Sequence, residues 1–163
     1  TVRELEEKLA STEKEIYGNL TGWQKVQMSR HPDRPQTYDY IEAICDEFNE
    51  LNGDRTVKDD KAIVGGMASI DGNPVMIIGH QKGKNTKERQ YHYFGMANHE
   101  GYRKALRLMI MAENFNNPFI TLIDTMGAYP GLVADERVPD ITIARDLMWM
   151  SLFNMLIIFI VFR

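Results

Sequence analysis

The sequence has 163 residues, a length that fits one domain or a piece of a larger protein. Its formal net charge of −4 gives no reason to expect nucleic acid or an anionic membrane surface as a partner. Its one cysteine, Cys45, excludes an internal disulfide, and no CxxC spacing for zinc occurs in the sequence.

The chain begins with two predicted helices. Leu5, Leu9 and Ile16 recur near helical spacing and predict an amphipathic helix over residues 2–20. Its apolar stripe is thin, so we expect it to pack on a partner or at the domain edge rather than in a core. The helical pattern resumes after Trp23 and ends in the proline-rich turn at residues 31–35.

A third helix is predicted over residues 38–51. Thr37 is a suitable N-cap, and Asn52 and Gly53 follow its last turn. Apolar residues recur at helical spacing between these limits. We therefore expect residues 1–53 to form an N-terminal helical region.

A β-hairpin is predicted next, from β-rich segments at residues 62–70 and 74–79 joined by Asp71-Gly72. Gly65 and Gly66 inside the first strand indicate a bulge or a close backbone contact. The second strand is continuously apolar over four residues, which predicts burial on both faces.

A helix over about residues 99–115 follows the hairpin and leads into an apolar strand at residues 120–123. The order strand, helix, strand implies a crossover connection and parallel pairing. A second helix over residues 140–151 and a last apolar strand at residues 156–162, expected to be buried, complete the chain. These elements together predict an α/β fold.

The stretch that organises the chain begins where the strand at 120–123 breaks at Asp124. The turn that follows holds Gly127, Pro130 and Gly131, and α/β proteins place ligand sites at such strand ends. Gly127 and Gly131 have no Cβ, so a substrate can approach their N–H groups, which can bind an oxyanion without any side chain. On the local sequence pattern alone, an ordinary strand-to-helix connection is an equally well supported alternative. Asp124 is either a general base or, as we favour, a carboxylate that orients the loop.

A basic loop at residues 79–88 resembles a phosphate-binding loop but departs from the Walker pattern. It has three residues between its glycines instead of four, and Asn85 follows the lysine. Lys82 and Gly83 are retained as candidates for contact with an anionic ligand, and a solvated surface loop is the alternative. The four histidines lack the spacing of a compact metal site, so no bound metal is expected. Nucleophile-elbow and dinucleotide-binding motifs are also absent from the sequence.

Six motifs resemble the alpha-subunit family of bacterial acetyl-coenzyme A carboxylase carboxyltransferases. They occur in the order RHPDRP (30–35), GDR (53–55), DKAIVGG (60–66), MIIGHQKG (76–83), GYRKALR (101–107) and DTMGAYPG (124–131). The resemblance covers nearly the whole chain, and the run IIGHQKG and the loop DTxGAYPG are its most specific motifs. It implies a crotonase-like spiral of ββα units, here incomplete, with a partial carboxyltransferase domain at residues 54–163.

The resemblance also implies an activity and partners. In this family, carboxybiotin on the biotin carboxyl carrier protein gives its carboxyl group to acetyl-coenzyme A, and malonyl-coenzyme A results. No covalently bound cofactor is implied, because carboxybiotin and acetyl-coenzyme A are substrates. The implied protein partners are a beta subunit, a second alpha subunit and the carrier protein. Nucleic acid and membrane are not expected as partners, and a cytoplasmic location is expected because the charged N-terminus lacks an apolar signal core.

Under this resemblance the catalytic positions are Gly127 and Ala128. Asp124, Tyr129 and Gly131 are expected to bind substrate with them, and Lys82 and Gly83 are second choices for the same role.

Three departures from the family pattern affect the expected activity. Met126 stands where the family has proline, which removes a φ constraint from the loop, and Val138-Pro139 replaces a glycine and a small or polar residue. The sequence stops where the family continues into a glycine-rich run that supplies an oxyanion hole. We therefore expect a truncated alpha subunit with little turnover alone. A non-catalytic assembly module is the alternative, and a different acyl-coenzyme A enzyme of the crotonase superfamily is a weaker one.

Overall fold

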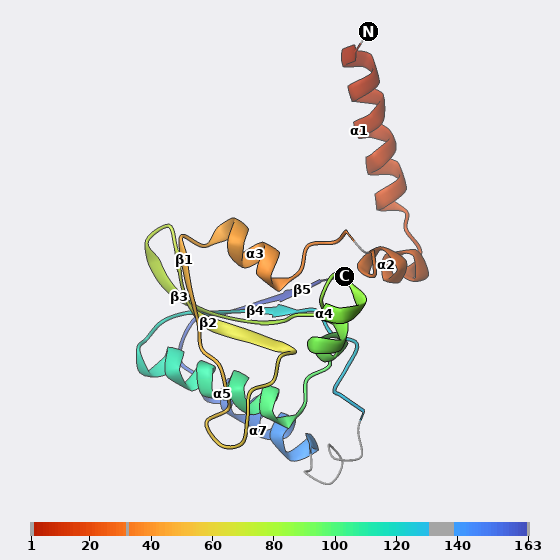
Figure 1. Cartoon of the computed structure of the whole chain (residues 1–163). Coiled ribbons are helices and arrows are strands. Elements are labelled where there is room, and N and C mark those ends of the chain that lie inside the picture. The colour runs from red at the N-terminus through yellow and green to blue at the C-terminus, as the bar shows by residue number, and fades with distance from the viewer. Residues whose placement is uncertain (1, 32, 131–138, 163) are drawn as a thin grey trace. The chain divides into compact units, whose positions relative to one another are not determined.

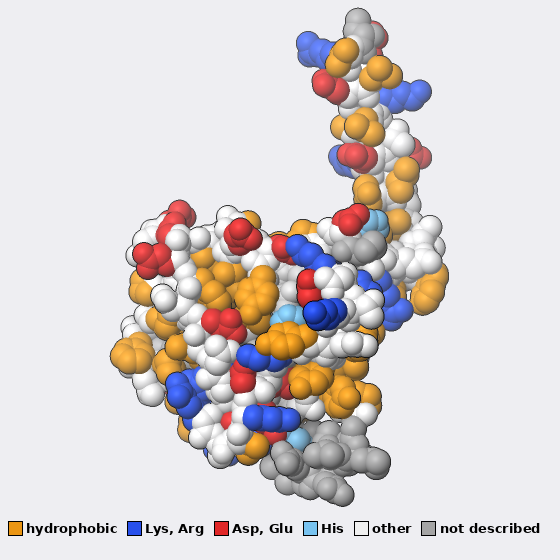
Figure 2. Space-filling view, viewed as in Figure 1, with side chains coloured by type: hydrophobic (Ala, Val, Ile, Leu, Met, Phe, Trp, Pro, Cys, Tyr) orange, Lys and Arg blue, Asp and Glu red, His pale blue; other side chains and the backbone are white. Residues whose placement is uncertain are grey.

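The computed structural model describes residues 2–31, 33–130 and 139–162. Its first compact unit ends at Arg34 and holds α1 (Val2–Gly18) and α2 (Gly22–Ser29). Both predicted N-terminal helices are thus confirmed. No residue of α1 is buried, and apolar and charged side chains are interspersed along it (Figure 2). As predicted, α1 is not part of a core.

The second unit, Pro35–Phe162, is built on one five-stranded sheet (Figure 1). The strand order follows the sequence: β1 (Glu47–Glu50), β2 (Ile63–Ile70), β3 (Asn73–His80), β4 (Phe119–Ile123) and β5 (Ile157–Val161). The first three strands pair antiparallel, whereas β4 pairs parallel with both β3 and β5. The predicted hairpin and the predicted parallel crossover are both confirmed.

Helices cover the two faces of this sheet (Figure 1). Helices α5 (His99–Asn114) and α7 (Pro139–Leu152) lie on one face, and α3 (Thr37–Ile44) lies on the other. In β3, Met76 and Ile78 pack toward α5 whereas Val75 and Ile77 pack toward α3. All four are buried, so the predicted two-sided burial is confirmed. Each such side chain stabilises the fold by roughly 1.5–3 kcal/mol.

The two glycines of β2 allow close packing on both sides. A Cβ at Gly66 would lie 2.1 Å from the backbone oxygen of Asn49 in β1, and one at Gly65 would lie 2.5 Å from Leu108 Cδ1 in α5. The residue pairing of β2 with β1 and with β3 is continuous. The predicted close contact is therefore confirmed, and the alternative of a bulge is wrong.

The predicted helix over residues 38–51 is wrong in its second half. Helix α3 ends at Ile44, Cys45 is extended, and residues 47–50 form β1. The reason is that β1 pairs with β2 from Glu47 to Glu50, and sheet pairing overrides a helical spacing of apolar residues. Phe48 packs from β1 against the core on the α3 side. The predicted division of the chain between residues 53 and 54 stays a prediction.

The connection from β3 to α5 contains two short helices, α4 (Thr86–Tyr91) and η1 (Tyr93–Gly95). The Asn85 side chain accepts a hydrogen bond from Glu88 N–H and caps α4. This capping turns part of the predicted basic loop into ordered helix.

The last strand is correctly predicted, but its expected burial is wrong. β5 lies at the edge of the sheet, and the side chains of Ile158, Phe159, Ile160 and Val161 are 38–52% exposed. An edge strand has a neighbour on one side only, which leaves its side chains less covered than those of β3. Within the described ranges, no helix is both long and apolar enough to cross a membrane.

Candidate functional site

The candidate site lies where β3 and β4 end. These neighbouring strands are parallel, so the loops that follow them leave the sheet at the same edge. Lys82, after β3, donates to Asp124, after β4, with Nζ 2.5 Å from Oδ1. The two side chains are 24% and 7% exposed, respectively. The structure thus brings together two predicted site residues that are far apart in the sequence.

The start of α3 holds the Lys82 side of the site. Gln36 Oε1 accepts hydrogen bonds from Gly83 N–H at 2.8 Å and from Gln81 Nε2 at 2.9 Å. Thr37 Oγ1 donates to the backbone oxygen of His80 at 2.6 Å. Gly83 has a φ of +91°, and a Cβ there would lie 2.5 Å from the carbonyl carbon of Glu88. Its N–H is engaged by Gln36, just as the Lys82 ammonium is engaged by Asp124.

The glycine loop, residues 124–130 as far as the structure describes it, contains the open position Gly127. Its φ is +148°, and no heavy atom lies within 4 Å of where a Cβ would be. Its N–H donates to Thr125 Oγ1 at 3.1 Å, and that hydroxyl donates to the Gly127 oxygen at 2.9 Å. Ala128 follows and is exposed. Gly127 and Ala128 are therefore accessible, but the Gly127 amide has an internal acceptor that a substrate oxygen would replace.

Tyr129 contacts two residues of the segment before α5. Its N–H donates to the Ala97 oxygen at 3.0 Å, and its ring lies edge-on to Tyr93 with centroids 5.7 Å apart. This gives the loop a fixed end next to its open glycine. Gly131, the remaining predicted site residue, lies outside the described residues.

His80 is a site neighbour that the motif analysis considered only as a metal ligand. Burial lowers the pKa of its imidazole, and a hydrogen bond to the Leu122 backbone and the charge of Asp124 oppose that shift. A lowered pKa keeps the ring neutral at pH 7. Of the groups that the structure describes, none is hydrogen-bonded to His80 Nδ1.

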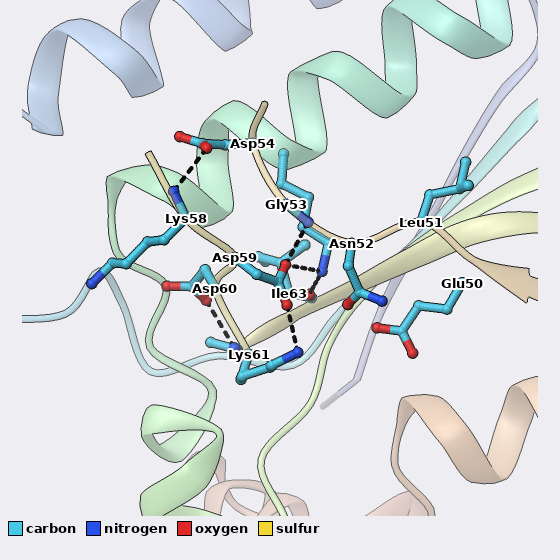
Figure 3. Close-up of polar contacts among 12 residues, drawn as sticks. Glu50, Leu51, Asn52, Gly53, Asp54, Lys58, Asp59, Asp60, Lys61 and Ile63 are labelled. Atoms are coloured by element: carbon cyan, nitrogen blue, oxygen red, sulfur yellow. Dashed lines mark hydrogen bonds and ion pairs between the residues drawn. The ribbon is translucent and has the colours of Figure 1, made fainter. Parts of the chain in front are cut away.

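A charged loop, residues 51–62, is held by polar contacts among its own residues (Figure 3) and contacts the segment before α5. Asp59 accepts hydrogen bonds from Gly53 N–H at 2.7 Å and from Lys104 Nζ at 2.9 Å, and it pairs with Lys61 at 2.6 Å. Asp60 accepts from the backbone and side-chain nitrogens of Asn98, each at 2.9 Å. The carboxylates thereby tie the loop to α5 and to the residue that precedes it.

Asp54 fixes the turn of the charged loop. Burial opposes its ionisation, but N–H groups of Val57 and Thr56 and the Arg103 guanidinium outweigh burial and lower its pKa to about 2. Arg103 lies 2.5 Å from Asp54 Oδ2. The carboxylate is therefore ionised at any physiological pH. Among the residues that the structure covers, no three His, Cys, Asp or Glu side chains are grouped to hold a metal ion.

The sequence analysis missed Gln36 and Gly95 as residues that shape the site. Each acts through contacts between segments that are distant in the sequence, and no local pattern marks Gln36. Gly95 lies in the aromatic stretch of residues 90–98, whose sequence is compatible with a pocket lining but more typical of aromatic packing. The arrangement combines an open glycine backbone with a fixed charge pair, which suits electrostatic stabilisation of a developing anion.

Comparison with protein families gives one match over residues 1–163, to the family described as acetyl co-enzyme A carboxylase carboxyltransferase-like. Among curated relatives, the acetyl-coenzyme A carboxylase carboxyl transferase subunit alpha of Flavobacterium johnsoniae is 62% identical over 151 residues, covering 92% of this chain and 48% of the relative. The subunit of the same name from Xylella fastidiosa is 57% identical over 150 residues. The chain spans about half the length of these relatives.

Solved structures share the fold at low sequence identity. The match to transcarboxylase 12S has a TM-score of 0.64 at 20% identity and spans 80% of this chain and 23% of the transcarboxylase chain. A single-chain long-chain acyl-CoA carboxylase has a TM-score of 0.65 at 21% identity, covering 82% of this chain and 12% of its own. The match to the beta subunit of P. aeruginosa geranyl-CoA carboxylase has a TM-score of 0.60 and spans 78% of this chain and 22% of that subunit. The predicted crotonase-like α/β fold is confirmed by these likenesses.

Proposed function

The chain belongs to the acetyl co-enzyme A carboxylase carboxyltransferase-like family, and from this we propose that it forms part of a carboxyltransferase alpha subunit. The proposed reaction moves the carboxyl group of carboxybiotin, carried by the biotin carboxyl carrier protein, to acetyl-coenzyme A, giving malonyl-coenzyme A. The substrate side of this proposal rests on the alpha-subunit relatives in Flavobacterium and Xylella. In the cell, malonyl-coenzyme A would feed fatty acid synthesis.

The observation that carries the proposal is the open backbone of Gly127 beside the Lys82–Asp124 pair. Carboxyl transfer develops negative charge on the donor and on the enolate of the acceptor, and backbone N–H groups stabilise such charge without a nucleophilic side chain. No heavy atom lies within 4 Å of the Gly127 Cβ position, and we propose that the substrate reaches these amides through this open space. Asp124, held by Lys82, fixes the start of the loop, and Tyr129, held by Ala97, fixes its far end.

We further propose that the alpha chain faces carboxybiotin while a beta subunit binds the coenzyme A substrate. A second alpha subunit and the carrier protein complete the proposed set of partners, and the assembly is expected in the cytoplasm. A polypeptide of residues 1–163 alone is expected to show little transfer, because it spans about half of its relatives' length.

Reconstitution tests the proposal. Residues 1–163 are joined to the C-terminal remainder of the Flavobacterium johnsoniae alpha subunit, which is 62% identical over the shared part, and mixed with the beta subunit of that organism. Malonyl-coenzyme A-dependent carboxylation of free biotin, the reverse half-reaction, is then measured. Activity well above that of the beta subunit alone supports the proposal. Activity equal to the beta subunit alone, with the complex intact in gel filtration, refutes it.

A second function, a non-catalytic assembly module, is favoured by one observation. The N–H groups of Gly83, Gly127 and Tyr129 all have acceptors within the chain, so the loop as it stands does not present them to a substrate. The reconstituted complex separates the two functions, because an assembly module would restore the complex without adding transfer.

A further inference from the structure

We propose that the left-handed turn at Tyr93–Gly95 is a positioning element that sets the geometry of the glycine loop. Three successive residues of this turn have positive φ values: +49° at Tyr93, +57° at Phe94 and +76° at Gly95. Only the third is glycine. Left-handed backbone is unfavourable for Tyr and Phe because Cβ approaches a carbonyl oxygen, and runs of it persist only where neighbouring contacts enforce them.

The charged loop enforces the turn from both ends. On one side, His92 Nδ1 lies 2.6 Å from the Lys61 oxygen. On the other side, Asn98 N–H donates to Asp60 at 2.9 Å. Within the turn, Gly95 N–H donates to the His92 oxygen and Met96 N–H to the Tyr93 oxygen, each at 2.9 Å. The strained residues are therefore held by contacts that do not involve the glycine loop.

The left-handed turn and the residue Ala97 after it contact the site at three points. A Cβ at Gly95 would lie 2.8 Å from Lys82 Cγ and 3.2 Å from the backbone oxygen of Asp124. The glycine therefore lies against both residues of the ion pair. The Tyr93 ring packs edge-on to Tyr129. Ala97, two residues after the turn, accepts the Tyr129 N–H. One short segment thus touches the start and the far end of the glycine loop.

These contacts give the turn a specific task. Only a residue without Cβ lets the stem of Lys82 pass over the turn to reach Asp124, and only a rigid turn places the Tyr93 ring and the Ala97 oxygen together against Tyr129. The consequence for carboxyl transfer rests on the proposed function. The positional consequence, a loop held in one geometry, does not, and is measured separately.

Hydrogen exchange tests the positional consequence in the full 163-residue chain. Gly95→Ala is compared with Gly72→Ala, a matched control, because Gly72 has a similar φ of +74° but no heavy atom within 4 Å of a Cβ. We expect the Tyr129 amide to exchange about tenfold faster in Gly95→Ala than in Gly72→Ala, while amides of β3 and β4 agree within about twofold. Equal Tyr129 exchange in both variants, or uniform acceleration through the sheet, overturns the proposal.

A second variant decides the matter if Gly95→Ala does not fold. Tyr93→Ala removes the ring that faces Tyr129 but leaves the glycine in place, and Tyr93→Phe keeps the ring contact. Faster Tyr129 exchange in Tyr93→Ala but not in Tyr93→Phe supports the proposal, and identical exchange in both contradicts it.

Kinetics of the reconstituted complex test the catalytic consequence. With Gly95→Ala, kcat for carboxyl transfer in the reverse half-reaction is expected to fall about tenfold with an unchanged KM for malonyl-coenzyme A, because a displaced loop loses transition-state contacts rather than binding of the coenzyme A substrate. An unchanged kcat contradicts the positioning role in catalysis. A wild-type complex without transfer would refute the proposed function, whereas the exchange comparison would still decide whether the turn positions the loop.

Discussion

Lys82 Nζ lies 2.5 Å from Asp124 Oδ1 and joins the segment after β3 to the segment after β4. The two side chains are separated by 42 positions in the sequence, and parallel pairing of their strands makes the contact. Asp124 is buried, and this ammonium group contributes to compensating the charge of its carboxylate.

Replacing Lys82 with Met is expected to destabilise the chain by about 2 kcal/mol, below the usual 3–5 kcal/mol for a fully buried pair because Lys82 is partly exposed. Urea unfolding measures this free energy. The double variant Lys82→Met/Asp124→Asn is expected to recover part of the loss, because it leaves no uncompensated charge. Lys84→Met, in an exposed pair with Asp39, is the control and should change stability little. A double variant that is no more stable than Lys82→Met would contradict the pairing.

Gly66→Ala is expected to be far more disruptive than Gly65→Ala. The added methyl at Gly66 meets the rigid Asn49 backbone at 2.1 Å, whereas at Gly65 it meets the flexible end of Leu108 at 2.5 Å. Overpacking against a side chain costs about 1–3 kcal/mol, and separation of β1 from β2 costs more. Thermal unfolding of the two variants side by side makes the comparison. Equal melting temperatures would show that β1 does not pack as described.

Lys104 is expected to contribute strongly to stability, because it is fully buried and donates to Asp59 and to the Ile63 oxygen. Lys104→Met leaves both acceptors with one donor fewer and should cost about 3 kcal/mol. The exposed Lys87→Met is the matched control. If urea unfolding finds the two variants alike, the charged loop is not held to α5 through this lysine.

Asp146 in α7 is expected to make stability fall as pH rises. Burial raises the pKa of this carboxyl to about 7, against the opposing charge of Arg145, whereas an unfolded Asp has a pKa near 3.9. Between about pH 4 and 7 the folded state therefore holds a proton that the unfolded state has lost, so stability decreases across this range and levels off above it.

Asp146→Asn removes this dependence. The variant should be more stable than the wild type by roughly 2 kcal/mol at pH 8 and by clearly less at pH 5. Urea unfolding at both pH values measures the difference, with Glu6→Gln on exposed α1 as the control. A gain that is the same at both pH values would argue against a protonated Asp146.

The sequence predicts the elements with strong local signals. Asp71-Gly72 marks the hairpin, and the spacing of apolar residues marks α5 and the crossover to β4. It fails at β1, because Phe48 fits a helix face as well as a strand, and only the pairing with β2 decides between them. It fails on the burial of β5 because strand order, not composition, places that strand at the edge.

The candidate site is predictable to the same extent. Asp124, Gly127 and Lys82 are found from a strand end, a glycine turn and a family motif. The pairing of Lys82 with Asp124 and the role of Gly95 are not found, because both depend on the spatial meeting of loops. Gln36 has no sequence signal at all, since an ordinary glutamine reaches Gly83 only after α3 is packed beside β3.

The role of the glycine loop in carboxyl transfer is tested by measuring the activity of the reconstituted complex that carries Gly127→Val. Gly72→Val, at an exposed hairpin turn with similarly open space around its Cβ position, is the control. We expect Gly127→Val to lower transfer at least about a hundredfold, while the complex still forms in gel filtration and Gly72→Val retains its activity. Undiminished transfer by an assembled Gly127→Val complex would contradict the assignment of this loop as the site of carboxyl transfer.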